Sequence, residues 1–196
     1  MRRRALLWAV LLAAGCEDQS GLPLPVPIPD VAQIRSSRAE LGQVQTVQVV
    51  GLPGAVSGAG AVSASAEGVK VDAPATAGGT FALSIAARGG GTIALSYAGS
   101  ATVKLVVPAM THAPAVALGP IDGVPPIAAA AGKVTVRGRV DAAAVIGANL
   151  DTGDVAAAPV SSGTFSLELP GQSGQRIRVF IDDGTLGDIG WDLSVP

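Results

Sequence analysis

The chain has 196 residues, a length that fits one or two domains. Hydrophobic residues make up 48% of it but aromatic residues only 3%, so its core must be built from Val, Ile, Leu and Ala. The net charge is −2, and it becomes more negative without the three arginines at positions 2–4. This charge provides no electrostatic basis for binding nucleic acid, and we expect no nucleic-acid partner.

Residues 1–15 have the organisation of a secretory signal peptide. Three arginines precede an apolar run over residues 5–14, and Ala13, Ala14 and Gly15 then lead to Cys16. The apolar run is much shorter than the roughly 20 residues that span a bilayer. We therefore predict that residues 1–15 are removed from the mature protein.

Leu12-Ala13-Ala14-Gly15-Cys16 resembles a bacterial lipobox, although lipoproteins of this kind prefer Leu where this chain has Ala13. The resemblance implies that Cys16 receives diacylglycerol, that cleavage occurs before it, and that the new N-terminus is acylated, for example with palmitate. With Glu17 rather than Asp after the cysteine, it also implies an outer-membrane location. The alternative is an ordinary signal peptide that leaves Cys16, the chain's single cysteine, as a free thiol.

Residues 16–41 are predicted to be a spacer. Residues 22–29 read LPLPVPIP, and proline at every second position favours an extended polyproline II segment. A proline-rich recognition motif is the alternative. Asp30 is placed to cap a short helix over residues 31–41.

An internal repeat covers most of the rest of the chain. Residues 79–85 (GTFALSI) match residues 163–169 (GTFSLEL) at a shift of 84, and residues 93–97 match 177–181 at the same shift. Residues 47–51 match 134–138 at a shift of 87, and residues 105–108 match 193–196. A period of this size indicates a duplicated domain rather than a solenoid.

Within each repeat, apolar residues alternate with polar ones and turn residues separate the runs, which predicts short half-buried β-strands. The fold class is therefore all-β, with sandwiches at residues 42–108 and 130–196 and a proline-containing linker at 109–129. Phe81 and Phe165 fall at equivalent inward positions. Both rings should be buried, and each half should hold a core that folds alone.

The second repeat resembles carboxypeptidase-regulatory-like, transthyretin-like domains at Val136-x-Gly138-x-Val140, residues 145–148 and Gly163-Thr164-Phe165-x-Leu167. The first repeat, with Gly54-Ala55-Val56 and Gly79-Thr80-Phe81, is similar to bacterial immunoglobulin-like domains. The resemblance implies two tandem Greek-key sandwiches of the immunoglobulin-like type. It implies no activity, because the matching residues are structural.

The sequence predicts no enzyme, no cofactor and no catalytic residue. Its one histidine, His112, falls in the predicted linker, and no nucleophile elbow or phosphate-binding loop is present. Two aspartate groups are weak candidates for calcium ligands: Asp151 and Asp154, and Asp182, Asp183 and Asp188. Their spacing fits no calcium-binding loop, so we expect no metal.

Four arginines form a candidate ligand surface in the second repeat. Arg137 and Arg139 lie in one predicted strand and Arg176 and Arg178 in another, all on the polar side of the alternation, and Phe180 continues the second row. On one sheet, these side chains would suit an anionic polysaccharide or lipid headgroup. The alternative is a solvated face with cross-strand ion pairs to Glu168 or Asp192.

These features together predict a non-enzymatic, lipid-anchored protein of the cell envelope that serves as a structural or protein-interaction module. Its partners would be the membrane, through the lipid, and an envelope protein or glycan. One alternative is a module that binds anionic polysaccharide or lipid headgroups through the second domain. Another is an accessory lipoprotein of a secretion or export assembly.

Overall fold

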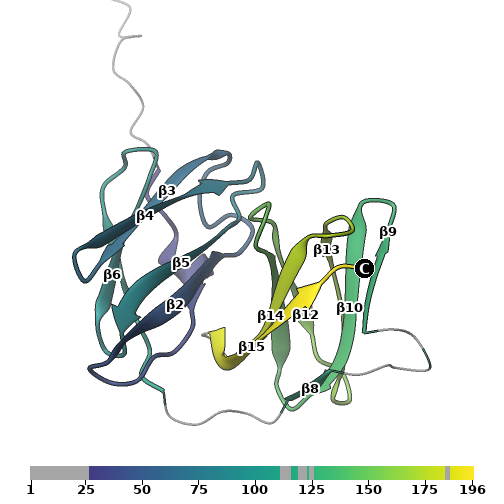
Figure 1. Cartoon of the computed structure of the whole chain (residues 1–196). Coiled ribbons are helices and arrows are strands. Elements are labelled where there is room, and N and C mark those ends of the chain that lie inside the picture. Colours follow the sequence, from purple (N-terminus) through teal and green to yellow (C-terminus); the bar gives the residue numbers. More distant parts are fainter. Residues whose placement is uncertain (1–26, 111–115, 119–122, 124–125, 184–185) are drawn as a thin grey trace, which may run out of the picture.

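The structure, a computed structural model, describes residues 27–110, 116–118, 123, 126–183 and 186–196, with the backbone alone at 116–118 and 187–192. The regular structure of the described chain is β-strand in antiparallel sheets, apart from one short 3-10 turn (Figure 1). The all-β prediction is therefore confirmed. Cys16, His112 and residues 16–26 of the predicted spacer lie outside the described residues.

Strands from residues 34–107, here called the N-terminal half, form two sheets. One sheet has the order β1-β2-β5 and the other β4-β3-β6-β7, and all pairs are antiparallel. The strands are β1 (Ile34–Ser36), β2 (Val44–Gly51), β3 (Gly60–Ala66), β4 (Val69–Ala75), β5 (Phe81–Arg88), β6 (Thr92–Tyr97) and β7 (Val103–Val106).

Strands from residues 116–195, the C-terminal half, repeat this arrangement. One sheet has the order β13-β10-β8, with β9 also paired to β10, and the other has the order β12-β11-β14-β15. The strands are β8 (Val116–Leu118), β9 (Ile127–Ala130), β10 (Lys133–Val140), β11 (Ala144–Asn149), β12 (Val155–Pro159), β13 (Thr164–Pro170), β14 (Arg176–Asp182) and β15 (Leu186–Ser194).

The two halves also share their strand register. Gly51 pairs with Phe81 in the first half, and Gly138 pairs with Phe165 in the second. Residues that match in the two repeats, 47–51 and 134–138, are thus paired with matching residues of the neighbouring strand in each half. Equivalent positions in the two halves can therefore be compared residue by residue.

Each half has its own apolar core on the inward side of the strand alternation. Phe81 is fully buried in the first and Phe165 is 3% exposed in the second, as predicted. Gly51 has to lack a side chain because a Cβ there would lie 2.3 Å from the Phe81 ring. The aromatic ring and the glycine opposite it thus form one packing unit.

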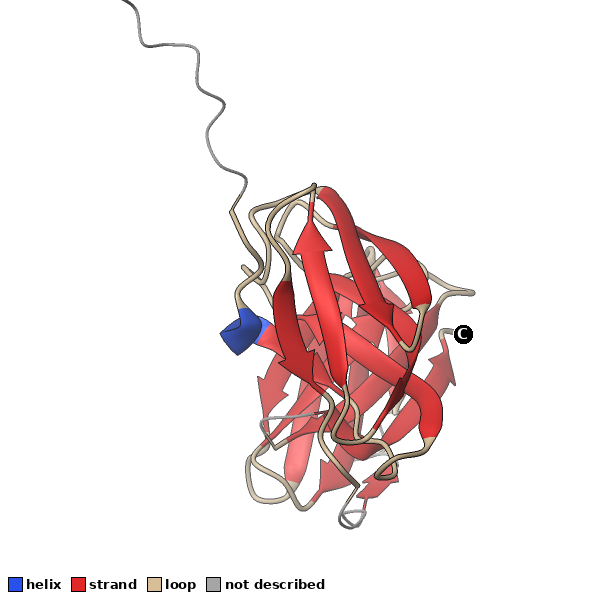
Figure 2. Cartoon of the chain, turned by 90° about the vertical axis from the view of Figure 1, so that its left-hand side faces the viewer, coloured by secondary structure: helices blue, strands red, loops and turns tan. Residues whose placement is uncertain are grey.

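The predicted helix over residues 31–41 is wrong beyond its first turn. Asp30 does accept a hydrogen bond from the Ala32 amide, at 3.0 Å, but the helix is a 3-10 turn that covers only Val31–Gln33 (Figure 2). The chain becomes extended at Ile34, because Ile34 and Ser36 are buried where β1 pairs with β2. Tertiary burial overrides the local capping signal here.

The segment predicted as a linker, residues 109–129, also contributes strands. Residues 116–118 form β8 and residues 127–130 span β9, and both pair with β10. Residue 109 forms a parallel bridge with Ala39. Pairing along β10 is the reason that part of this segment belongs to a sheet rather than to a connector.

Candidate functional site

A third apolar cluster joins the two halves, and it is the most distinctive feature of the molecule. The N-terminal half contributes the end of β2, and the C-terminal half contributes the outer face of its four-stranded sheet. Its buried members are Val50, Leu52, Ile146, Ala148, Val155, Phe180 and Leu186, with Ala82 and Leu150 packed against them. We call this contact the junction.

Phe180 is a central member of the junction, which corrects the prediction that it lies on an exposed ligand surface. Its side chain is only 2% exposed. The alternation in β14 does turn Phe180 away from the core formed by Val179 and Ile181, as expected. The N-terminal half covers this outward face of β14. Phe180 therefore points away from the core of its own half and into the apolar cluster of the junction.

Polar contacts surround the apolar centre of the junction. The Arg35 Nε atom lies 3.3 Å from Asp182 Oδ1, and the Arg38 guanidinium pairs with the Asp183 carboxylate. The Thr80 hydroxyl donates a buried hydrogen bond to the Gly153 carbonyl at 3.1 Å. These contacts join residues more than 70 positions apart and fix where one half meets the other.

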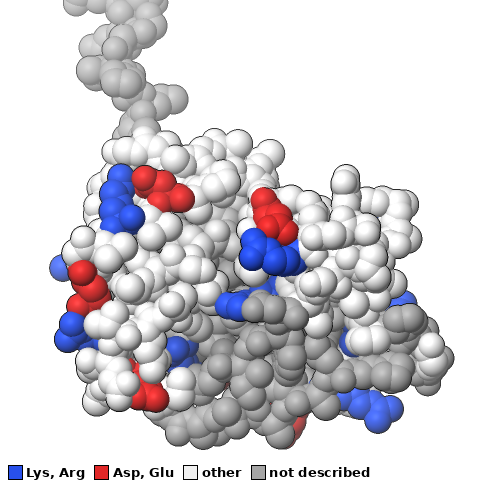
Figure 3. Space-filling view, in the orientation of Figure 1, with Lys and Arg blue, Asp and Glu red and all other residues white. Residues whose placement is uncertain are grey.

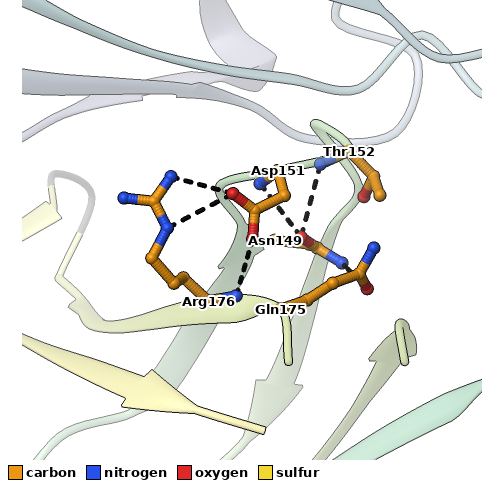
Figure 4. A network of polar contacts seen from close by, with 5 residues as sticks. All are labelled: Asn149, Asp151, Thr152, Gln175 and Arg176. Carbon is orange, nitrogen blue, oxygen red and sulfur yellow. Dashed lines mark hydrogen bonds and ion pairs between the residues drawn. The ribbon is translucent and has the colours of Figure 1, made fainter. Parts of the chain in front are cut away.

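The turn that carries Gly153 is shaped by Asn149 (Figure 4). The fully buried Asn149 accepts hydrogen bonds at Oδ1 from the amides of Asp151, at 3.1 Å, and Thr152, at 3.3 Å. Its Nδ2 donates to the Pro170 carbonyl and to Gln175 Oε1, at 3.2 and 3.0 Å. A buried amide with all these partners holds the turn in one conformation.

Asp151 links the same turn to β14. Its carboxylate accepts from the Arg176 Nη2, at 2.8 Å, and from the Arg176 backbone amide, at 2.8 Å (Figure 4). These hydrogen bonds, the one from the side chain first, lower the pKa of Asp151 below its ordinary value. Arg176, one of the four arginines of the predicted ligand surface, thus forms an ion pair at the edge of the junction.

A groove borders the junction on the side of Arg176. It consists of two hollows of about 290 and 260 Å³ that share Gln48, Ser84, Leu150 and Arg176 in their walls. Gln48 and Ser84 come from the N-terminal half and are hydrogen bonded to each other at 2.9 Å. The walls offer amide, hydroxyl and guanidinium groups for hydrogen bonding.

The four arginines do not form one surface. Arg137 and Arg139 lie in β10, in the sheet with β13 and β8, whereas Arg176 and Arg178 lie in β14, in the other sheet of the same half. Arg137 instead lies 3.5 Å from the Ser166 hydroxyl of the neighbouring strand. Strand order, which the alternation does not encode, separates the two rows, so the condition for a four-cation patch, that both rows lie on one sheet, is not met. On the face drawn in Figure 3, some blue groups lie beside red ones and others stand apart from them, and the blue groups do not gather into one large patch.

The aspartates considered for calcium have other partners in the structure. Asp151 pairs with Arg176, and Asp182 and Asp183 pair with arginines of the N-terminal half. Asp154 accepts from the Thr152 hydroxyl at 2.7 Å. The side chain of Asp188 lies outside the described residues. Within the described part of the chain, no three metal-ligating side chains converge.

The junction was missed at the sequence level, although a signal for it existed. Val145 and Ile146 are adjacent apolar residues, and so are Val179, Phe180 and Ile181. Strands covered on both faces show such uninterrupted apolar runs instead of alternation.

In the described residues, no helix is long and apolar enough to cross a bilayer.

No known protein family matches the chain, and no curated protein matches it. Among solved structures, it is similar to type I pullulanase from Bacillus subtilis strain 168, crystallised with maltose, at 8% identity and a TM-score of 0.27. The match covers 82% of this chain and 24% of that one, and its TM-score carries no argument about function.

Proposed function

We propose that the chain is a lipid-anchored protein of the cell envelope that acts as a non-enzymatic structural or protein-interaction module. In this proposal, each half is an immunoglobulin-like Greek-key sandwich, and residues before 27 tether the pair to the membrane. The observation that carries the proposal is the lipobox-like segment that ends at Cys16, the chain's single cysteine. A lone thiol in an oxidising envelope is a liability unless it is modified, and lipidation modifies it.

The junction supports the choice of a structural module. Apolar contacts, two ion pairs and a buried hydrogen bond between the halves hold them in one arrangement. A display or scaffolding role needs such a fixed shape more than it needs a reactive group. A single histidine and a single cysteine also leave few side chains of the kind that carry nucleophilic or acid–base catalysis.

The test is metabolic labelling with a palmitate analogue, together with detergent-phase partitioning. The native chain should be labelled and enter the detergent phase, because two or more acyl chains give stable membrane binding. Cys16→Ser should abolish both. Labelling that persists in Cys16→Ser would end the proposal.

Glu17→Asp is the matched control for this experiment. It changes the adjacent residue and keeps the thiol, so it should be labelled like the native chain. In fractionated membranes, the native protein should be found in the outer membrane, and Glu17→Asp should move toward the inner membrane. Native protein in the inner membrane would contradict the outer-membrane part of the proposal and leave the lipid anchor intact.

A further inference from the structure

The junction joins two different surfaces. The N-terminal half uses the outer face of its β1-β2-β5 sheet, with Val50, Leu52 and Ala82, which we call the docking face. The C-terminal half uses the outer face of its β12-β11-β14-β15 sheet, which we call the receiving face. On the receiving face, β11, β12 and β14 contribute Ile146, Ala148, Val155 and Phe180, and β15 contributes Leu186. An interface between two unlike faces does not close on itself, so it can in principle be repeated from one unit to the next.

The C-terminal half has its own copy of the docking face, and that copy is polar. Gly51 pairs with Phe81 as Gly138 pairs with Phe165, so the register assigns an equivalent to each docking residue. Val50 corresponds to Arg137, Leu52 to Arg139 and Ala82 to Ser166. Arg139 and Ser166 are exposed and Arg137 is half-buried. Two arginines and a serine thus replace the residues that bury the junction in the other half.

The N-terminal half likewise has a polar copy of the receiving face. Ser63 pairs with Ser96 where Ile146 pairs with Phe180, and Ser65 pairs with Lys70 where Ala148 pairs with Val155. These serines and the lysine are exposed or half-buried. Ser63 also donates to the Asp72 carboxylate, which lies on the same face.

We propose that the docking and receiving faces recognise another half of the same fold, and that the polar copies at the two ends are caps. Arg137, Arg139 and Ser166 cap the C-terminal half, and Ser63, Ser65, Lys70 and Ser96 cap the N-terminal half. The caps limit docking to one pair of halves, because a second chain would have to remove charged guanidinium and ammonium groups and polar hydroxyl groups from water. Terminal units of repeat proteins carry polar outer faces for the same reason.

The test removes one cap at a time from the chain comprising residues 17–196. The first variant carries Arg137→Val, Arg139→Leu and Ser166→Ala, which recreate the docking face on the C-terminal half. The second variant carries Ser63→Ile, Ser65→Ala, Lys70→Val and Ser96→Phe, which recreate the receiving face on the N-terminal half.

Each variant alone should remain at the mass of one chain in analytical ultracentrifugation, because its new face lacks a counterpart. An equimolar mixture should double in mass and grow no further. A chain with both sets of substitutions should form head-to-tail assemblies that lengthen with concentration. A mixture of folded variants that stays at the mass of one chain would overturn the proposal.

A matched control separates specific docking from general adhesion. Thr135→Val and Glu168→Leu lie on the same face of β10 and β13, at positions equivalent to Gln48 and Ser84, which border the junction without forming it. This variant, mixed with the second one, should not associate. Association as strong as that of the first variant would show that the cap residues have no special role.

The reverse substitutions test the proposal even if a variant without one of the caps does not fold. Val50→Arg with Leu52→Arg places the arginines of the C-terminal cap on the native docking face. The halves should then separate, and small-angle scattering should record a larger radius of gyration, whereas Thr46→Arg on the same strand should leave it unchanged. An unaltered radius in the double variant would show that arginines at these positions do not block docking.

Discussion

Strands β3 and β11 occupy equivalent places in the two halves, yet their surroundings differ. In β3, buried residues alternate with half-buried or exposed ones, as in a strand with one face in solvent. In β11, every residue from Val145 to Asn149 is buried. Equivalent strands of equivalent sheets therefore differ in burial: β3 is covered on one face, whereas β11 is covered on both. The comparison teaches that the tandem arrangement is encoded in the outer face of one repeat.

Replacing the aromatic ring at the junction is the strongest way to test this difference. Phe180→Ala should lower the free energy of unfolding by about 3–5 kcal/mol, because it leaves a cavity between the halves. Ser96→Ala, at the equivalent position of β6, should change it by less than about 0.5 kcal/mol. Urea unfolding of both variants measures the contrast. Equal effects would mean that the two outer faces are energetically alike.

The next largest effect is expected at Asn149. Asn149→Ala should lower the free energy of unfolding by about 1–3 kcal/mol, because the amides and carbonyl that it satisfies lose buried partners. The equivalent position in the N-terminal half is Ala66, which precedes a two-residue turn over Glu67 and Gly68. Hydrogen exchange of the Asp151 and Thr152 amides should increase in the variant. Unchanged exchange would contradict the assignment of the turn's shape to Asn149.

The glycines of the two equivalent turns provide a finer comparison. Gly153 and Gly68 both have positive φ, +80° and +76°, so alanine should destabilise each by about 1–2 kcal/mol. A Cβ at Gly153 would also lie 3.3 Å from the Pro74 carbonyl across the junction, whereas nothing lies within 4 Å of a Cβ at Gly68. The midpoint of thermal unfolding should therefore be lower for Gly153→Ala than for Gly68→Ala. The reverse order would argue against close packing of this turn on β4.

The smallest effect concerns pH. The pKa of Asp151 is lowered in the folded chain by its hydrogen bonds from Arg176, so its contribution to stability is present above its ordinary pKa of 3.8 and is lost as the pH falls through the lower folded value. Asp151→Asn should flatten the decline of stability in this acidic range and leave the slope at neutral pH unchanged. The unfolding midpoint of both proteins, measured at a series of acidic pH values, gives this decline. An identical acid slope in both proteins would exclude a role for this ion pair.

The sequence was sufficient for the repeat, for most strands of the two predicted sandwiches and for which of their side chains point inward, because alternation and the GTF segments are local signals. It missed β1, which lies in the predicted helix, and β8 and β9, which begin in the predicted linker. Phe81 and Phe165 lie where their phase predicts. Phe180 was misplaced because alternation tells only which face avoids a strand's own core, and not whether that other face meets solvent. The ion pairs of Arg35 and Arg38 join residues 147 and 145 positions apart, and no local pattern announces such partners. Strand order likewise separated the arginine rows.

Strand β1 has a mechanical consequence. Ile34 to Ser36 are paired along β2, and within the same few residues Arg35 and Arg38 contact the C-terminal half. A force that enters the chain upstream of residue 34 therefore reaches both halves at once. It loads the β1–β2 hydrogen bonds and the two ion pairs together, so the tension is shared between two attachments before either sandwich has to extend.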